Sequence, residues 1–283
     1  MFNLRIAILF CLCAMLPLRV LAAELNSAAR FELPHTHKVA IKSPSGIAYE
    51  LVISLPASYK NSPNKRYPIV YYTDAQWDAP LLNSIYQDLA FDKAVPELVM
   101  VGITYSGVKP NYTALRTKDL TPTKDENFVR DSGGGEAFLT FIKETIIPKV
   151  ESEYRIDTRQ RAIAGWSFGG LFALYAMYSE PELFTRCIAV SPAIPWHNEY
   201  ISQLDDKFFK ANRKFSARLF ISHGSNEATA FVASVSEFQN KVKNRKDPHL
   251  QLMNFRVDNM AHAGAKASAY AQGLVWVWKD IQP

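Results

Sequence analysis

One serine stands inside a short glycine-rich turn, Gly165-Trp166-Ser167-Phe168-Gly169. The mostly apolar residues 161–164 before it predict a buried strand, and the unbroken apolar stretch 171–178 after it predicts a buried helix. A serine at so sharp a strand-to-helix turn takes a strained backbone conformation and needs flanking residues without a Cβ. The pattern therefore predicts Ser167 as a nucleophile. The alternative is a glycine-rich helix start that only packs closely on a strand.

A serine hydroxyl becomes an effective nucleophile when a base accepts its proton, and a third group must orient that base. Four histidines follow Ser167 in the chain. His262 is the candidate base, because residues 259–264 form a loop between the last predicted strand and the last predicted helix. His197 and His223 are predicted to line the pocket, and the alternative role for His223 is a hydrogen bond that orders its loop. His249 is predicted to lie in solvent.

The acid that orients the base is expected after the predicted strand 219–222, where the candidate is Glu227. Strand-turn-helix serine hydrolases of the α/β type carry their groups in the chain order serine, acid, histidine, which this assignment follows. A helix N-terminal glutamate favoured by the helix dipole is the alternative role for Glu227. Asp258, four residues before His262, is the competing acid.

The oxyanion of a tetrahedral intermediate needs backbone N–H donors. Phe168 directly follows the candidate nucleophile and is expected to supply one donor. The loop after the predicted strand 69–73 is expected to supply the other, from Gln76. This chemistry requires no metal and no cofactor.

The first 23 residues have the pattern of a secretory signal peptide, with a charged start, an apolar run over residues 6–18 and small residues at 22 and 23. The run is too short to span a membrane comfortably, and Pro17 and Arg19 interrupt its end. We therefore expect a periplasmic or secreted protein without a stable membrane anchor after cleavage.

Residues 24–283 are expected to form a single domain. The 32 basic side chains exceed the 27 acidic ones and are spread along the chain, which argues against a nucleic-acid partner. The candidate catalytic residues instead predict a small-molecule ester as the partner. Cys187 is the only cysteine after residue 23, so no intramolecular disulfide is expected, and its neighbours predict a buried strand thiol. The sequence leaves the oligomeric state open.

Predicted strands and helices alternate along most of the chain. The strands cover residues 37–41, 47–55, 67–73, 98–104, 161–164, 187–191, 217–222 and 250–257, and the helices cover 80–91, 136–154, 171–178, 229–242 and 265–279. The first two strands are expected to form a hairpin. Residues 105–135 are expected to be a long loop at the binding site. Pro148 is expected to kink the helix predicted over residues 136–154. This order predicts an α/β fold with a mainly parallel central sheet, an N-terminal antiparallel hairpin and helices on both faces.

Several segments resemble one known family. They are residues 67–74, 116–122, 134–138, 165–170, 191–193 and 224–227. In them the chain resembles the putative-esterase branch of the α/β-hydrolases, which includes enterochelin-type siderophore trilactone esterases, S-formylglutathione hydrolase and mycolyltransferases. Within that branch it looks closest to the siderophore-esterase-like serine hydrolases, over roughly residue 38 to the C-terminus.

The resemblance implies an α/β-hydrolase fold and places Arg116 towards an anionic substrate such as a siderophore lactone. A salt bridge of Arg116 with Asp119 is the alternative. Trp77 and Trp196 are further expected substrate contacts. Two departures stand out: the family usually has Asp-Gly where this chain has Asp74-Ala75, and often has paired aromatic residues at the position of Trp196.

Together these residues predict a secreted serine ester hydrolase that works through an acyl-enzyme. An acyltransferase or thioesterase would use the same triad, because the acyl-enzyme is common to all three activities. A non-catalytic ligand-binding protein of the same fold is the remaining alternative.

Overall fold

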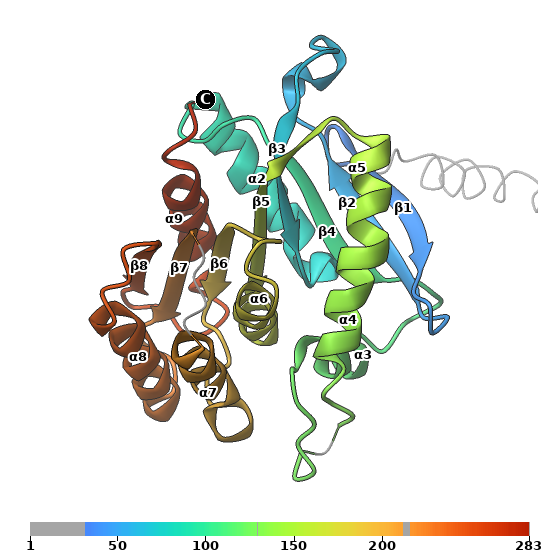
Figure 1. Ribbon diagram of the computed structural model, residues 1–283. Helices are drawn as coiled ribbons and strands as arrows, with labels where there is room; N and C mark the ends of the chain where they lie inside the picture. Colours follow the sequence, from blue (N-terminus) through green and yellow to red (C-terminus); the bar gives the residue numbers. More distant parts are fainter. Residues whose placement is uncertain (1–31, 129, 212–215, 283) are drawn as a thin grey trace, which may run out of the picture. The chain divides into compact units, whose positions relative to one another are not determined.

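An eight-stranded sheet is the frame of residues His35–Pro283, which form one compact unit. The computed structural model describes residues 32–128, 130–211 and 216–282, so the predicted signal peptide at 1–23 lies outside the described residues. The strands are β1 (Thr36–Lys42), β2 (Ala48–Ser54), β3 (Tyr67–Tyr72), β4 (Val99–Tyr105), β5 (Ile156–Trp166), β6 (Arg186–Val190), β7 (Ala217–Gly224) and β8 (Leu250–Val257). Figure 1 shows these strands in the order β1-β2-β4-β3-β5-β6-β7-β8.

Two antiparallel pairings, β1 with β2 and β2 with β4, lie at one edge of the sheet, and all other pairings are parallel. The predicted N-terminal hairpin and mainly parallel sheet are therefore confirmed. In a parallel sheet the carboxyl ends of the strands share one edge, and the loops that follow β3, β5, β7 and β8 carry the candidate catalytic residues.

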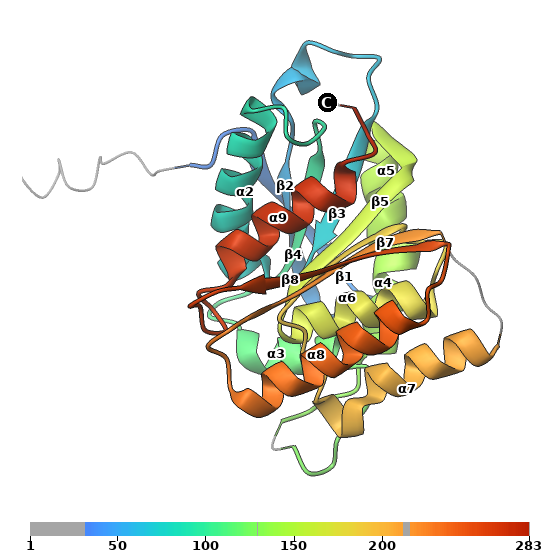
Figure 2. The ribbon, with the colours of Figure 1, turned by 90° about the vertical axis from the view of Figure 1, so that its left-hand side faces the viewer.

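Helices cover both faces of the sheet, as predicted. They are α2 (Ala75–Phe91), α3 (Tyr112–Leu120), α4 (Gly135–Phe141), α5 (Ile147–Glu153), α6 (Phe168–Ser179), α7 (Trp196–Lys210), α8 (Thr229–Asn244) and α9 (Lys266–Trp278), with short turns at η1 (Ala57–Lys60) and η2 (Ile142–Ile146). Figure 2 shows α2 and α9 on one side of the sheet and α6 and α8 on the other.

Side chains of the central strands alternate between two cores, because successive residues of a strand point to opposite faces. On β6, Cys187 and Ala189 enter the core beneath α6, and Ile188 and Val190 enter the core beneath α2 and α9. The predicted buried thiol is confirmed: Cys187 is fully buried, and burial raises its pKa.

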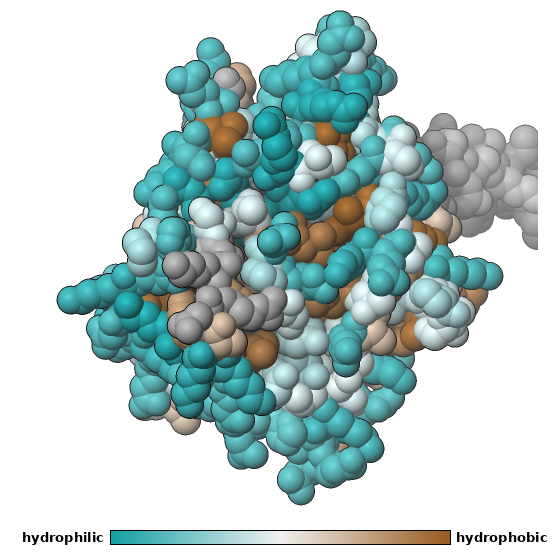
Figure 3. Space-filling view, viewed as in Figure 1, coloured by the Kyte–Doolittle hydropathy of each residue, from teal (hydrophilic) through white to brown (hydrophobic). Residues whose placement is uncertain are grey.

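The outer surface is largely hydrophilic on the face drawn in Figure 3, with apolar residues gathered in smaller patches.

The structure corrects one expected loop and refines one expected helix. Residues 105–135 contain α3, which begins where the Asn111 side chain accepts a hydrogen bond from the Ala114 N–H at 3.1 Å. The expected helix 136–154 is divided by the π-helical turn η2 just before Pro148. Proline has no N–H to donate, which accounts for a π-helical turn at this point, and the kink expected at Pro148 stays a prediction. No helix in the described part of the chain combines the length and the apolar character needed to cross a membrane.

Candidate active site

Ser167 occupies the strained turn between β5 and α6. Its backbone angles are φ 59° and ψ −118°, in a region that side-chain-bearing residues rarely adopt. A Cβ on Gly165 would lie 2.3 Å from the backbone of Gly169, and a Cβ on Gly169 would lie 2.3 Å from Oγ1 of Thr73. The turn therefore needs glycine at both positions, and it brings the first turn of α6 against the end of β3.

His262 and Glu227 form a short pair. The Nδ1 atom of His262 lies 2.6 Å from Oε2 of Glu227, whose side chain is only 2% exposed. The other carboxylate oxygen accepts hydrogen bonds from Ser191 Oγ at 2.7 Å and from the Gly224 N–H at 2.6 Å. Burial alone would raise the pKa of Glu227, but these three hydrogen bonds outweigh it and lower the pKa. Glu227 is thus an ionised, fixed acceptor beside the imidazole.

The competing acid lies elsewhere. The Asp258 side chain is 73% exposed and pairs with Arg256 at 3.3 Å. The geometry therefore brings His262 together with Glu227 and leaves Asp258 in solvent.

The loops that carry Glu227 and His262 are joined by backbone hydrogen bonds. The Asn226 N–H donates to the Met260 carbonyl at 2.9 Å, and the Ser225 N–H donates to the Val257 carbonyl at 2.9 Å. A Cβ on Gly224 would lie 2.3 Å from the same Met260 carbonyl oxygen. The two loops approach so closely because Gly224 has no side chain, and this contact sets the spacing of Glu227 and His262.

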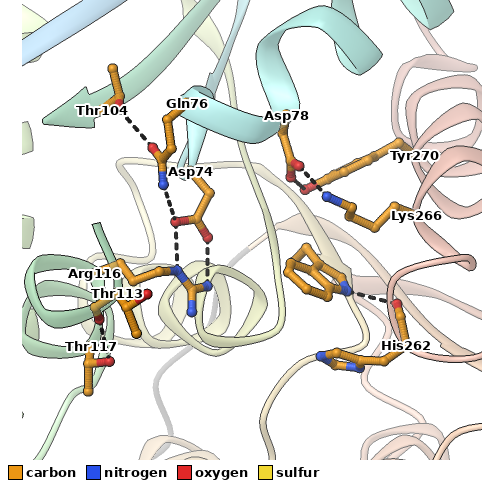
Figure 4. Close-up of polar contacts among 11 residues, drawn as sticks. Asp74, Gln76, Asp78, Thr104, Thr113, Arg116, Thr117, His262, Lys266 and Tyr270 are labelled. Carbon is orange, nitrogen blue, oxygen red and sulfur yellow. Dashed lines mark hydrogen bonds and ion pairs between the residues drawn. The ribbon is translucent and has the colours of Figure 1, made fainter. Parts of the chain in front are cut away.

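Trp166, directly before Ser167, holds His262 from a second side. Its indole N–H donates to the His262 carbonyl oxygen at 3.0 Å, which is the dashed line to His262 in Figure 4. The two rings lie with their centroids 4.7 Å apart, and the Phe231 ring lies 5.2 Å from the imidazole. Because Nδ1 faces Glu227, Nε2 is the ring nitrogen on the opposite side, where a nucleophile would meet the base.

The remaining histidines have other surroundings. His223 is buried within β7, and burial lowers its pKa. His197 pairs through Nδ1 with Oγ1 of Thr123 at 2.8 Å. His249 is exposed, in keeping with the predicted solvent position.

Both expected oxyanion donors stand in first turns of helices, Phe168 in α6 and Gln76 in α2. Backbone N–H groups there have no carbonyl partner within their own helix, so they point outwards as donors. The Gln76 side chain is held separately: it accepts from Thr104 Oγ1 at 2.7 Å and donates to Asp74 Oδ1 at 3.3 Å (Figure 4). Gly169 lies close to Asp74, so the two helix starts adjoin.

Arg116 pairs with Asp74 rather than with Asp119. Its Nε donates to Asp74 Oδ1 at 2.8 Å and its Nη2 donates to Asp74 Oδ2 at 2.7 Å (Figure 4). The alternative salt bridge with Asp119 is wrong, because Asp119 accepts from the Tyr49 hydroxyl at 2.7 Å instead. Burial raises the pKa of Asp119, as expected for a carboxylate that has lost water and gained only neutral donors.

The two tryptophans expected at the substrate differ in exposure. Trp77 is 44% exposed, and the guanidinium of Arg116 lies 5.7 Å from its ring centroid. Trp196 is buried, with its ring 5.3 Å from Phe168 and 5.1 Å from Phe128. Trp77 therefore has a ring face that a ligand could contact. Trp196 instead packs against the rings of Phe168 and Phe128 and is buried by them.

Sequence reasoning missed four contacts of this site: Asp74 with Arg116, Ser191 with Glu227, Trp166 with His262, and Asp78 with Lys266. Trp166 lies inside the serine turn, and Asp74, Arg116 and Ser191 lie in segments that resemble the esterase family, but the sequence linked none of them to its partner. Within residues 32–128, 130–211 and 216–282, no group of three or more metal-ligating side chains stands close enough to hold an ion.

The family described as "Putative esterase" has a sequence model that matches residues 46–263, which is more than half of the chain. The chain belongs to this esterase family. Ferri-bacillibactin esterase BesA of Bacillus subtilis (strain 168) is 26% identical over 234 residues, which cover 77% of this chain and 75% of BesA. Siderophore triacetylfusarinine C esterase of Aspergillus fumigatus is 29% identical over 207 residues, which cover 69% of each chain.

Among solved structures, BES protein from Bacillus cereus superposes with a TM-score of 0.81 at 22% identity, over 89% of this chain and 99% of that chain. The likeness shows the fold: the mainly parallel sheet with helices on both faces is of the α/β-hydrolase type, as predicted. The family match and the esterases among its relatives show that this protein is an esterase enzyme.

Proposed function

We propose that this esterase is a serine hydrolase in which Ser167 is the nucleophile, His262 the base and Glu227 the acid. The observation that carries the proposal is the 2.6 Å contact between His262 Nδ1 and Glu227 Oε2, in a chain that also holds Ser167 in a strained turn. Trp166 supports it further, because it precedes the nucleophile in the chain and binds the carbonyl of the base.

In the proposed reaction, Ser167 Oγ attacks the ester carbonyl carbon while His262 Nε2 accepts the hydroxyl proton. Glu227 fixes the ring through Nδ1 and stabilises the imidazolium. The N–H groups of Phe168 and Gln76 stabilise the oxyanion. His262 then gives its proton to the departing alkoxide, and an acyl-enzyme remains. Water, deprotonated by His262, then attacks the acyl carbon. As the bond from the acyl carbon to Ser167 Oγ breaks, His262 returns the proton to Oγ, which releases the carboxylic acid and restores the free enzyme.

We propose siderophore esters as the substrate class. The support is the names of two relatives, ferri-bacillibactin esterase BesA and siderophore triacetylfusarinine C esterase. Trp77 directly follows Gln76 in the turn of residues 74–76, called here the oxyanion turn, and its exposed ring offers an aromatic contact for such a ligand. Because Asp74 already neutralises Arg116, we propose that Arg116 positions the turn instead of binding anions directly.

We propose further that the chain is exported, on the strength of the signal-peptide pattern over residues 1–23. N-terminal sequencing of the protein recovered from its producing cells tests this. A mature N-terminus at residue 23 or 24 is expected, and a retained Met1 would contradict export by cleavage.

An ester panel tests the proposed activity. The wild type and Ser167→Ala are assayed with p-nitrophenyl acetate, p-nitrophenyl butyrate, and ferric and iron-free catecholate trilactones, each with and without an added alcohol. We expect hydrolysis of the trilactones at the highest kcat/KM, free acid as the main product, and no turnover by Ser167→Ala. Products dominated by the new ester would indicate acyl transfer, and trilactones left intact would contradict the substrate class.

A further inference from the structure

We propose that Lys266 is a positioning residue for the reaction, because it holds Trp166 and the start of α2 in place around the nucleophile. Its Nζ donates to Asp78 Oδ1 at 2.5 Å and lies 4.6 Å from the centroid of the Trp166 ring. The inference rests on the proposed function of Ser167 and His262. Figure 4 shows Lys266 between Asp78 and the loop of His262.

The ion pair is buried. The side chain of Asp78 is 0% exposed and that of Lys266 is 16% exposed. Burial raises the pKa of Asp78, while Lys266 and the Tyr270 hydroxyl, which donates to Oδ2 at 3.0 Å, act in the opposite direction. An ammonium group and a carboxylate that have both lost water attract each other more strongly than surface charges do.

Lys266 stands where a helix disfavours it. It is the first residue of α9, and the positive end of the helix dipole repels a cation there. Helix stability therefore does not explain this lysine. Asp78, in the first turn of α2, stands where the dipole favours a carboxylate. The partner contacts, and not the local helix, account for the placement of Lys266.

The contacts of Lys266 join three segments that carry proposed catalytic groups. Asp78 follows Gln76 by two residues, Trp166 precedes Ser167, and Lys266 follows His262 by four residues. A cation above an aromatic ring fixes the ring, and the Trp166 indole in turn fixes the His262 carbonyl. Loss of the ammonium group therefore loosens the base relative to the nucleophile, which lowers kcat more than it raises KM.

The test separates positioning from stability. Lys266→Met removes the charge and keeps the stem, Lys266→Arg keeps the charge, and Asp78→Asn combined with Lys266→Met leaves no unpaired buried charge. Lys241→Met is the control away from the site, because Lys241 joins α8 to α7 through Asp206 at 2.8 Å and the fully buried Asp205 at 3.6 Å, with its own side chain 30% exposed. For each variant, kcat and KM for p-nitrophenyl acetate, the melting temperature and the labelling of Ser167 by a fluorophosphonate are measured.

We expect Lys266→Met to lose about tenfold or more in kcat with KM nearly unchanged, because small displacements of a catalytic group are costly. Lys266→Arg should keep most of kcat, and Lys241→Met should melt earlier with kcat unchanged. The double variant should regain the melting temperature but not kcat. Recovery of kcat together with stability, or equal kcat in Lys266→Met and Lys241→Met, would overturn this inference alone. Absence of labelling at Ser167 in the wild type would instead overturn the proposed function on which it rests.

Discussion

Arg116 and Asp74 are joined by two parallel hydrogen bonds of 2.8 and 2.7 Å, with the Asp74 side chain 1% exposed. Asp74 has φ 60° and stands directly before α2, so the pair fixes the turn that carries Gln76. The guanidinium also lies 5.4 Å from the ring centroid of Phe168. One arginine on α3 thus lies against both proposed oxyanion segments, through Asp74 on one side and the Phe168 ring on the other.

Arg116→Ala is expected to destabilise the protein by about 3–5 kcal/mol, because it leaves Asp74 buried without its cation. It should also lower kcat for anionic and neutral esters alike, since the oxyanion turn loses its support. The ratio of kcat/KM for an anionic and a neutral ester of equal size is the measurement. Arg116→Lys is the control that keeps the charge but not the two-pronged contact. A rise in KM confined to anionic esters would instead make Arg116 a direct substrate contact.

His262→Ala is expected to lower kcat by about 10³-fold or more, close to the loss in Ser167→Ala, because nucleophile and base act as one unit. His223→Ala, His197→Ala and His249→Ala should be much milder. Steady-state kinetics with one activated ester compare them. If His223→Ala were inactive while His262→Ala kept its activity, the role of the base would belong to His223.

Glu227→Gln should lower kcat less than Ser167→Ala does, because the amide removes the orienting charge and leaves the nucleophile in place. Asp258→Asn is the matched control, since Asp258 is exposed and pairs only with Arg256 among the described residues. kcat is compared at one pH with one substrate. A larger loss in Asp258→Asn would transfer the acid role to that residue.

The lowered pKa of Glu227 also predicts a dependence of stability on pH. A carboxylate whose folded pKa lies below its ordinary value of 4.5 stabilises the fold above pH 4.5, and that contribution is lost as the pH falls through the lowered value. Urea unfolding of the wild type and Glu227→Gln should therefore show a stability difference that is steady near neutral pH and shrinks below pH 4.5. A difference that grows on acidification would contradict the lowered pKa.

Periodicity predicted most of the fold, because the strands and most helices bury continuous or regularly spaced apolar residues. It failed at α3, whose buried side chains include Arg116, Thr117 and Asp119. Polar residues look exposed in a sequence, and only their partners on distant segments make burial possible. α7, which follows the turn at Pro195, was not predicted either.

The glycine-flanked serine and the chain order serine, acid, histidine predicted Glu227 and His262 as a pair, and the structure places these two side chains in contact. The other side-chain contacts around the site could not be predicted from chain order. Asp74 and Arg116 are 42 positions apart, and Ser191 and Glu227 are 36 positions apart, so no local spacing links them. Such contacts arise from the order of the parallel strands, whose carboxyl ends bring distant loops to one edge.

Covalent labelling tests the role of Ser167 most directly. The wild type and Ser167→Ala are incubated with a fluorophosphonate, residual ester hydrolysis is followed over time, and the modified peptide is identified by mass spectrometry. We expect one adduct on Ser167, formed in step with the loss of hydrolysis, and no adduct in Ser167→Ala. An adduct on another residue with full loss of activity, or ester hydrolysis by Ser167→Ala at the wild-type rate, would contradict the assignment of Ser167 as the nucleophile.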